Sequence, residues 1–130
     1  AVKWFPTPTK GARARRMDID ENDVILVTLY RANAVAFFDT RAEKYTEYKR
    51  PGEWAAPYRA VTDKKGDVWV STMSSDKVVR FTPSTGKSVE YMMPTETNMR
   101  SAFVDKRGDK PIFWVGSNHT AALVKVEPLE

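Results

Sequence analysis

The feature that most constrains this chain is an internal repeat of about 43 residues. An aromatic residue stands three positions before a proline at three places, and each place is 43 residues from the next: Phe5–Pro8, Tyr48–Pro51 and Tyr91–Pro94. Asp20 and Asp63 are also 43 apart, and Asp105 follows 42 residues later. A fixed period of this length is typical of proteins in which each repeat is one small structural unit stacked on the next.

Each repeat has the pattern of several short β-strands. Runs such as VILVTLY, VWVSTM and IFWVGS are rich in β-branched and aromatic residues, and turn sequences such as DKKGDV separate them from their neighbours. Four strands in about 43 residues is the pattern of one propeller blade. We therefore predict an all-β fold in one domain, residues 1–130, with blades at approximately 9–50, 51–93 and 94–128 and one additional strand at 2–5.

The phase of the repeat predicts how the chain is completed. Residues 2–5 align with the fourth strand of the first two repeats, whereas the last repeat has only three strands. We expect the N-terminal strand to complete the last blade. Three blades fall short of the four to eight that form a ring. Two chains would supply six, so we predict a homodimer in which each chain is half of a six-bladed ring. A piece of a longer single-chain ring is the alternative.

Composition narrows the classes of partner. The chain has no cysteine, which excludes disulfides and thiolate metal sites. Its 21 basic and 17 acidic residues are spread along the sequence, which argues against nucleic-acid binding. No run approaches the roughly 20 apolar residues of a membrane-spanning helix, and the opening AVKWF does not have the pattern of a signal peptide.

Two motifs carry a resemblance to a known family. DKKGDVW and VRFTPSTGKSVEYMMP fit the patterns D-x-x-G-x-V-W and x-R-F-x-P-x-T-G-x-x-x-E-Y-x-x-P. In these motifs the chain resembles the streptogramin B lyase-like (virginiamycin B lyase-like) β-propellers, which are related to the NHL and gluconolactonase-type propellers. The resemblance covers the whole chain and is strongest from Asp63 to Glu130. It implies a periplasmic or secreted protein, although the residues themselves leave the compartment unknown.

The resemblance also implies a chemistry. Lyases of this family are expected to open a cyclic depsipeptide lactone by elimination, with Mg²⁺ held by acidic side chains and a histidine as general base. His119 is the sole histidine of this chain, so it is the candidate catalytic base. No paired carboxylates stand at the ends of the second strands, and we predict no metal ligands. No cofactor is therefore predicted, and Mg²⁺ enters only with the lyase hypothesis.

Three arginines recur at nearly equivalent positions before or within the first strand of each blade: Arg16, Arg59 and Arg100. The first strands line the channel of a propeller, so we expect these side chains to surround one mouth of it. The planar guanidinium suits a carboxylate or phosphate. The alternative is that each arginine pairs with an acidic neighbour and only orders the loops.

Other candidate ligand-binding residues lie close to these arginines in the sequence. Trp54, Tyr58 and Asn98 could form the wall of a ligand cleft, or they could pack between blades. Asn118 could orient His119 or a substrate carbonyl, or both could be polar turn residues. Asp20, Asp63 and Asp105 are expected to fix turns at the opposite end of the blades.

Two functions remain open from the sequence. The first is a non-catalytic propeller that binds a small anionic or peptide-like ligand, or a protein partner, on its arginine-lined face. The second is a lyase or lactone hydrolase that uses a divalent cation and His119. A single histidine and the lack of an acidic cluster favour the first.

Overall fold

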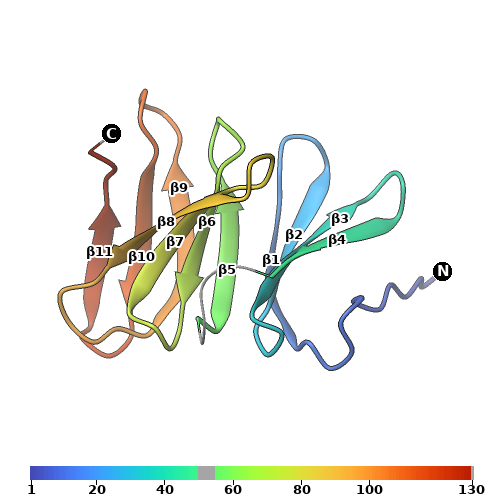
Figure 1. The fold of residues 1–130 in the computed structure, drawn as a ribbon, viewed down its shortest axis with the longest axis horizontal. Coiled ribbons are helices and arrows are strands. Elements are labelled where there is room, and N and C mark those ends of the chain that lie inside the picture. The colour runs from blue at the N-terminus through green and yellow to red at the C-terminus, as the bar shows by residue number, and fades with distance from the viewer. Residues whose placement is uncertain (50–54, 130) are drawn as a thin grey trace.

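The computed structural model describes residues 1–49 and 55–129 and places them in three antiparallel sheets that stand side by side (Figure 1). The first sheet contains β1 (Ala14–Ile19), β2 (Val24–Leu29), β3 (Ala34–Asp39) and β4 (Lys44–Tyr48). The second contains β5 (Pro57–Thr62), β6 (Val68–Thr72), β7 (Lys77–Thr82) and β8 (Lys87–Met92). The third contains β9 (Met99–Asp105), β10 (Ile112–Ser117) and β11 (Ala122–Val126).

Every sheet is a meander in which consecutive strands pair, in the orders β1-β2-β3-β4, β5-β6-β7-β8 and β11-β10-β9. The all-β prediction and the prediction of propeller blades are confirmed. Within the described ranges there is no helix that could cross a membrane. We refer to the three sheets as blades 1, 2 and 3.

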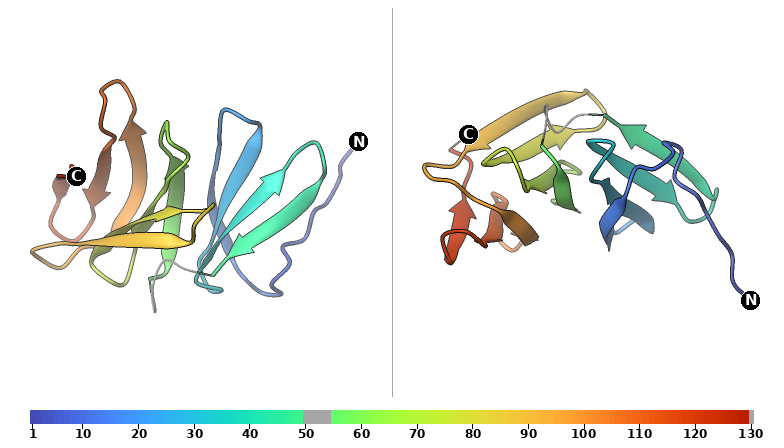
Figure 2. Two further views of the ribbon diagram at one scale, coloured as in Figure 1. Left: turned by 45° about the horizontal axis from the view of Figure 1, so that its top comes forward. Right: turned by 90° about the horizontal axis from the view of Figure 1, so that it is seen from below.

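The blades are arranged in an arc. The first strand of each blade lies on the concave side, where β5 contacts both β1 and β9. The outer strands β4 and β8 lie on the convex side, as the view from below shows (Figure 2). The arrangement brings the first strands together around one axis, as the sequence predicted.

Blade 2 is covered on both faces by its neighbours, and all five residues of β6 are buried. Because successive side chains in a strand point to opposite faces, Val68 and Val70 pack toward blade 1, in a cluster with Leu26. Trp69 packs toward blade 3, where its ring stacks on Phe113 with 5.6 Å between centroids. Two apolar layers therefore lie between the blades, and a third, smaller cluster that includes Leu29 and Ala36 lies within blade 1.

The two outermost faces of the arc are only partly covered. On blade 1, Met17 and Ile19 in β1 are 61% and 58% exposed. On blade 3, Phe103 and Leu123 are 57% and 70% exposed. Trp114, which pairs with Phe103 across the strands, lies on this open face beneath Lys125 and not between two blades. A single chain thus leaves part of one apolar sheet face exposed at each end of the arc.

The N-terminal segment differs from the prediction. Residues 2–5 are not a β-strand in the single chain, because no sheet edge lies beside them to supply hydrogen-bond partners. The segment instead runs along the open face of blade 1. The Phe5 ring packs on Phe38 with 4.8 Å between centroids, and Lys3 forms an ion pair with Glu43.

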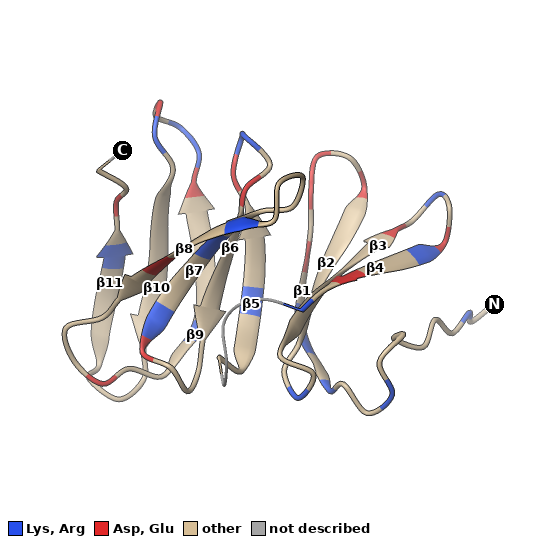
Figure 3. Ribbon diagram, viewed as in Figure 1, with Lys and Arg blue, Asp and Glu red and all other residues tan. Residues whose placement is uncertain are grey.

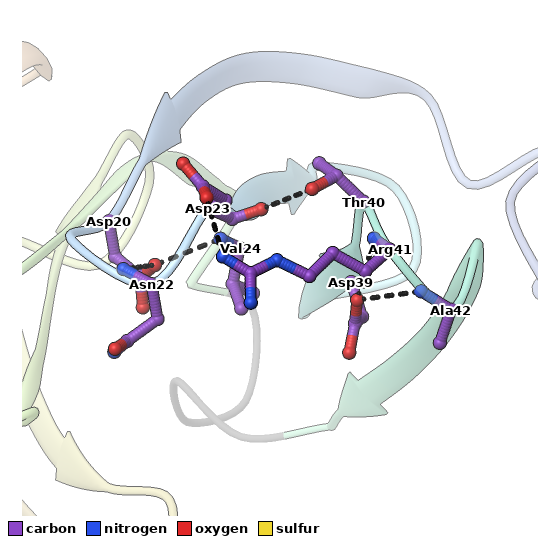
Figure 4. A network of polar contacts seen from close by, with 8 residues as sticks. All are labelled: Asp20, Asn22, Asp23, Val24, Asp39, Thr40, Arg41 and Ala42. Atoms are coloured by element: carbon purple, nitrogen blue, oxygen red, sulfur yellow. Dashed lines mark hydrogen bonds and ion pairs between the residues drawn. The ribbon is translucent and has the colours of Figure 1, made fainter.

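The aspartates at the ends of the first strands fix turns, as expected. Asp20 Oδ1 accepts hydrogen bonds from the backbone N–H groups of Asn22 and Val24 at 2.8 and 2.9 Å (Figure 4). Asp63 Oδ1 accepts from the N–H groups of Lys65 and Asp67 in the same pattern. These carboxylates replace the backbone acceptors that a tight turn leaves out of reach.

Asp63 makes one contact that Asp20 does not, and this contact predicts a difference in stability. Trp69 Nε1 donates a hydrogen bond to the buried Asp63 Oδ2 at 2.9 Å. We expect Asp63→Ala to lower the free energy of unfolding by about 3 kcal/mol, because it removes turn acceptors and leaves a buried indole N–H without a partner. Asp20→Ala is the matched control, with an expected cost of about 1 kcal/mol. Equal losses in urea unfolding would show that the indole bond contributes nothing.

The third turn predicts a pH dependence. The side-chain hydrogen bond from Arg107, followed by the Arg107 backbone N–H, lowers the pKa of Asp105 from 3.8 to about 2. A lowered folded-state pKa stabilises the fold above the unfolded value, and this contribution is lost as the pH falls from about 4 to about 2. We expect Arg107→Gln to raise the pKa of Asp105 toward 3.8 in an NMR titration. An unchanged pKa would mean that the guanidinium does not hold this carboxylate.

Candidate functional site

The three predicted arginines lie on the inner strands: Arg16 on β1, Arg59 on β5 and Arg100 on β9. In each blade the pairing of the first and second strands is interrupted near the arginine, between Ala14 and Met17, between Pro57 and Arg59, and opposite the step from Val115 to Ser117. Such irregularities bend a strand and redirect its side chains. The same local distortion therefore repeats at all three positions.

Two buried hydroxyl groups connect these positions across the blades. Thr28 Oγ1 donates to the Tyr58 carbonyl of the next blade at 2.6 Å and accepts from the Arg16 backbone N–H at 3.2 Å. Ser71 Oγ repeats the arrangement: it donates to the Arg100 carbonyl at 2.7 Å and accepts from the Arg59 N–H at 3.2 Å. Both residues are fully buried. Each hydroxyl therefore ties the distorted strand of one blade to the inner strand of the next.

The arginine side chains have three different environments. Arg59 Nη2 lies 3.2 Å from Asp18 Oδ2 of blade 1, and both side chains are about two-thirds buried. Arg16 lies over the ring of Tyr58, 5.5 Å from its centroid, and Nη2 donates to the Tyr58 hydroxyl at 3.3 Å. Arg100 Nε donates to Asn98 Oδ1 at 3.0 Å. Pairing with an acidic neighbour, the structural alternative, therefore applies to Arg59.

Within the part of the chain that the structure describes, Arg16 and Arg100 have no carboxylate partner. Both are exposed. Their guanidinium groups are charged at all relevant pH values. The inner strands β1 and β9 therefore carry two cations without a carboxylate partner, one on either side of the Arg59–Asp18 pair.

The predicted asparagines lie at the same end of the blades. The Asn118 backbone N–H donates to the Asn98 carbonyl at 3.1 Å, and Asn98 Nδ2 donates to the Met73 carbonyl at 3.3 Å. His119 follows Asn118 in an exposed turn. The structure thus brings Asn98, Arg100 and Asn118 together. Trp54 lies outside the described residues.

The donor set that Mg²⁺ would need is not assembled in the described residues. Within 1–49 and 55–129, no three histidine, aspartate or glutamate side chains come close enough together to hold a metal ion. Asp18 is a single carboxylate, and it is paired with Arg59. A hard cation requires several oxygen ligands. The described residues therefore do not fit a Mg²⁺ site.

The described hollows lie away from the arginines. One, of about 260 Å³, separates the β5–β6 turn from the β9–β10 turn, and a smaller one of about 120 Å³ adjoins the β1–β2 turn. Both are at the end of the blades where basic and acidic segments alternate (Figure 3). A third, of about 510 Å³, runs along β11. None of these three hollows is lined by Arg16, Arg59 or Arg100.

Sequence reasoning missed Asp18, Thr28 and Ser71. The two hydroxyl residues carry a signal, because they are 43 residues apart in equivalent second strands. Asp18 carries none, because its partner Arg59 is 41 residues away on another blade.

Comparisons with known proteins agree with this architecture. No family model matches the chain, and no curated protein matches it in sequence. Among solved structures, an inactive virginiamycin B lyase from Staphylococcus aureus with quinupristin is similar at a TM-score of 0.69 and 21% identity, over 95% of this chain and 44% of that one. A streptogramin B lyase gives 0.67 and 20%, over 94% and 43%. The extracellular domain of the putative one-component system BT4673 from B. thetaiotaomicron gives 0.57 and 16%, over 91% and 17%.

The chain spans less than half the length of the lyase structures that it matches. At these identities the likeness shows the fold. The chain folds as three blades of a β-propeller similar to those of the streptogramin lyases.

Proposed function

We propose that this chain is a non-catalytic binding module that takes a small anionic or peptide-like ligand at its arginine-lined end. The observation that carries the proposal is the repeated placement of arginine on three adjacent inner strands, with Asp18 the only carboxylate that contacts any of them in the described structure. Charged groups on convergent strands of a rigid scaffold are a common way of building a ligand site.

The contacts of each arginine suggest its role. The hydrogen bond to Tyr58 uses one of the five N–H donors of Arg16. The bond to Asn98 likewise uses one donor of Arg100. The remaining donors of each fork can bind a carboxylate through two parallel hydrogen bonds. Arg59, held by Asp18, is a positioning residue between them.

Tyr58 and the two asparagines extend the site beyond charge. The Tyr58 ring supports the Arg16 guanidinium, so a planar group of a ligand could stack beside it. The Asn98 and Asn118 side chains supply both donors and acceptors for amide groups. These groups suit a ligand that has a carboxylate and a peptide-like body.

One comparison supports a small-molecule site on this fold, because the similar virginiamycin B lyase structure contains quinupristin. The lyase alternative has less support from the residues of this chain. His119 is exposed in a turn, and among the described residues it belongs to no group of three His, Asp or Glu side chains that could hold a metal ion. The geometry supports binding better than general-base catalysis.

Calorimetric titration with citrate, a compact tricarboxylate, tests the proposal. We expect Arg16→Gln and Arg100→Gln each to weaken binding about 10-fold, because each loses a charge-assisted hydrogen bond. Arg100→Lys should fall between Arg100→Gln and the parent chain, because it keeps the charge but loses the fork.

The matched control is Arg41→Gln. Arg41 is also exposed, but it pairs with Asp23 at the other end of the blades (Figure 4). This variant should bind citrate like the parent chain. Equal losses of citrate affinity in the Arg41 and Arg100 variants would show that citrate responds only to the net charge of the chain, which would contradict a site at the arginines. Undetectable binding of citrate by the parent chain would also contradict the proposal.

A further inference from the structure

Two parts of this chain lack a pairing partner. One is the free edge of a strand in blade 3, and the other is an N-terminal segment that has the sequence of a strand but is not paired. The outer edge of β11 is unpaired, because blade 3 has three strands where blades 1 and 2 have four. A groove of about 510 Å³ runs along that edge, and its wall includes Tyr91 and Met93 of blade 2 and Val124 and Val126 of blade 3. The groove lies where the fourth strand stands in the other blades.

The second part is the N-terminal segment. By the 43-residue period, Trp4 and Phe5 occupy the positions of Glu47 and Tyr48 in β4. Val2 and Trp4 are nevertheless 97% and 84% exposed. A segment with the sequence of a fourth strand thus carries two of the most exposed apolar side chains in the described structure.

One aromatic contact shows which position the segment occupies. Between blades 1 and 2, Tyr48 of the outer strand β4 packs on Phe81 with 5.9 Å between centroids. Phe5 and Phe38 are each 43 residues earlier, and they pack at 4.8 Å. Phe5 therefore stands beside blade 1 as Tyr48 stands beside blade 2. Phe5 thus has the position of a residue in the outer strand of a blade that would stand before blade 1.

No preceding blade exists in the described chain, and β11 of the same chain is out of reach. The N-terminal segment and blade 3 lie at opposite ends of the arc (Figure 1). We infer that the groove along β11 binds residues 1–5 of a second copy of this chain, and that reciprocal exchange closes two arcs into a ring of six blades. Exchange of an identical element about a two-fold axis is a low-cost route to a closed dimer.

The register of the exchanged strand follows from blade 2. There β7 begins at Lys77, and Val78 and Val79 pair with Tyr91 and Glu90. β11 begins at Ala122, so Leu123 and Val124 are the equivalents of Val78 and Val79. By the 43-residue period, Phe5 and Trp4 are the equivalents of Tyr91 and Glu90. Phe5 of the second copy therefore lies opposite Leu123, and Trp4 of the second copy lies opposite Val124. Trp4 thereby enters the apolar groove, at the position where the other outer strands carry glutamate.

The same closure covers the two open faces. Blade 1 of one copy would stand against blade 3 of the other, so Met17 and Ile19 would meet Phe103 and Leu123. These four are among the most exposed large apolar residues of the described strands. Uncovered sheet faces and unpaired edges of this kind are association surfaces.

Light scattering during size-exclusion chromatography tests the inference. We expect a mass near 30 kDa, twice the 14.8 kDa of the chain. Trp4→Ala should weaken dimerisation at least about 30-fold, the loss typical of a buried aromatic anchor. The control is Leu129→Ala, which alters a terminal apolar residue that is also largely exposed but does not line the groove, and it should stay dimeric.

Arg100→Gln should also stay dimeric, which separates this inference from the proposed ligand site. A folded parent chain that remains a 14.8 kDa monomer at micromolar concentration overturns the inference. A dimer that Trp4→Ala leaves intact overturns the strand exchange. Circular dichroism of each variant identifies any loss that comes from unfolding.

Cross-linking tests the register. Arg80 pairs with Val89 in blade 2, so Lys3 of the second copy should lie opposite Lys125. Because the chain has no native cysteine, oxidation of Lys3→Cys/Lys125→Cys should yield a covalent dimer, since directly opposed strand residues are within disulfide distance. Lys3→Cys/Lys110→Cys should remain uncross-linked, because Lys110 lies on the β9–β10 turn. Equal cross-linking of both pairs, or of neither, contradicts this register.

Discussion

The structure depends on one constraint: the apolar face of each sheet must pack against a neighbouring sheet to be removed from water. Blade 2 satisfies it on both faces, with every residue of β6 buried and Trp69 stacked between Tyr91 and Phe113. Burial of apolar surface between sheets is the main force that stabilises such a fold. Blades 1 and 3 satisfy the constraint on one face each. Apolar side chains on the outer faces of blades 1 and 3 therefore stay exposed, which is the physical reason to expect association.

The same stacking explains how the candidate site is built. Blades that pack face to face bring their inner strands together, and Thr28 and Ser71 hold each inner strand to the next through buried hydroxyl groups. A buried hydroxyl that satisfies two backbone groups is costly to replace. The guanidinium groups of Arg16 and Arg100 are thus mounted on a rigid frame, and ring closure by a second copy would place two such sets around one axis.

Much of this fold could be predicted from sequence, because a 43-residue period repeats both the strand pattern and the turn aspartates. Asp20 and Asp63 fix turns as expected because an aspartate acts on amides only two to four residues away. The site was less predictable. The Asp18–Arg59 pair joins two blades, and the side toward which Arg59 points depends on a local irregularity that composition does not reveal. Residues 2–5 show the other limit: their sequence is that of a strand, but pairing requires an edge that the single chain does not place beside them.

Small-angle X-ray scattering in dilute buffer distinguishes a closed ring of two chains from a single arc of three blades. A closed pair of 260 residues should give a radius of gyration of about 18 Å, against about 14 Å for a compact single chain. We expect the larger value, with a forward scattering intensity that matches two chains and, after correction for concentration, does not change on dilution through the micromolar range. A radius near the smaller value, with the intensity of one chain, would contradict it.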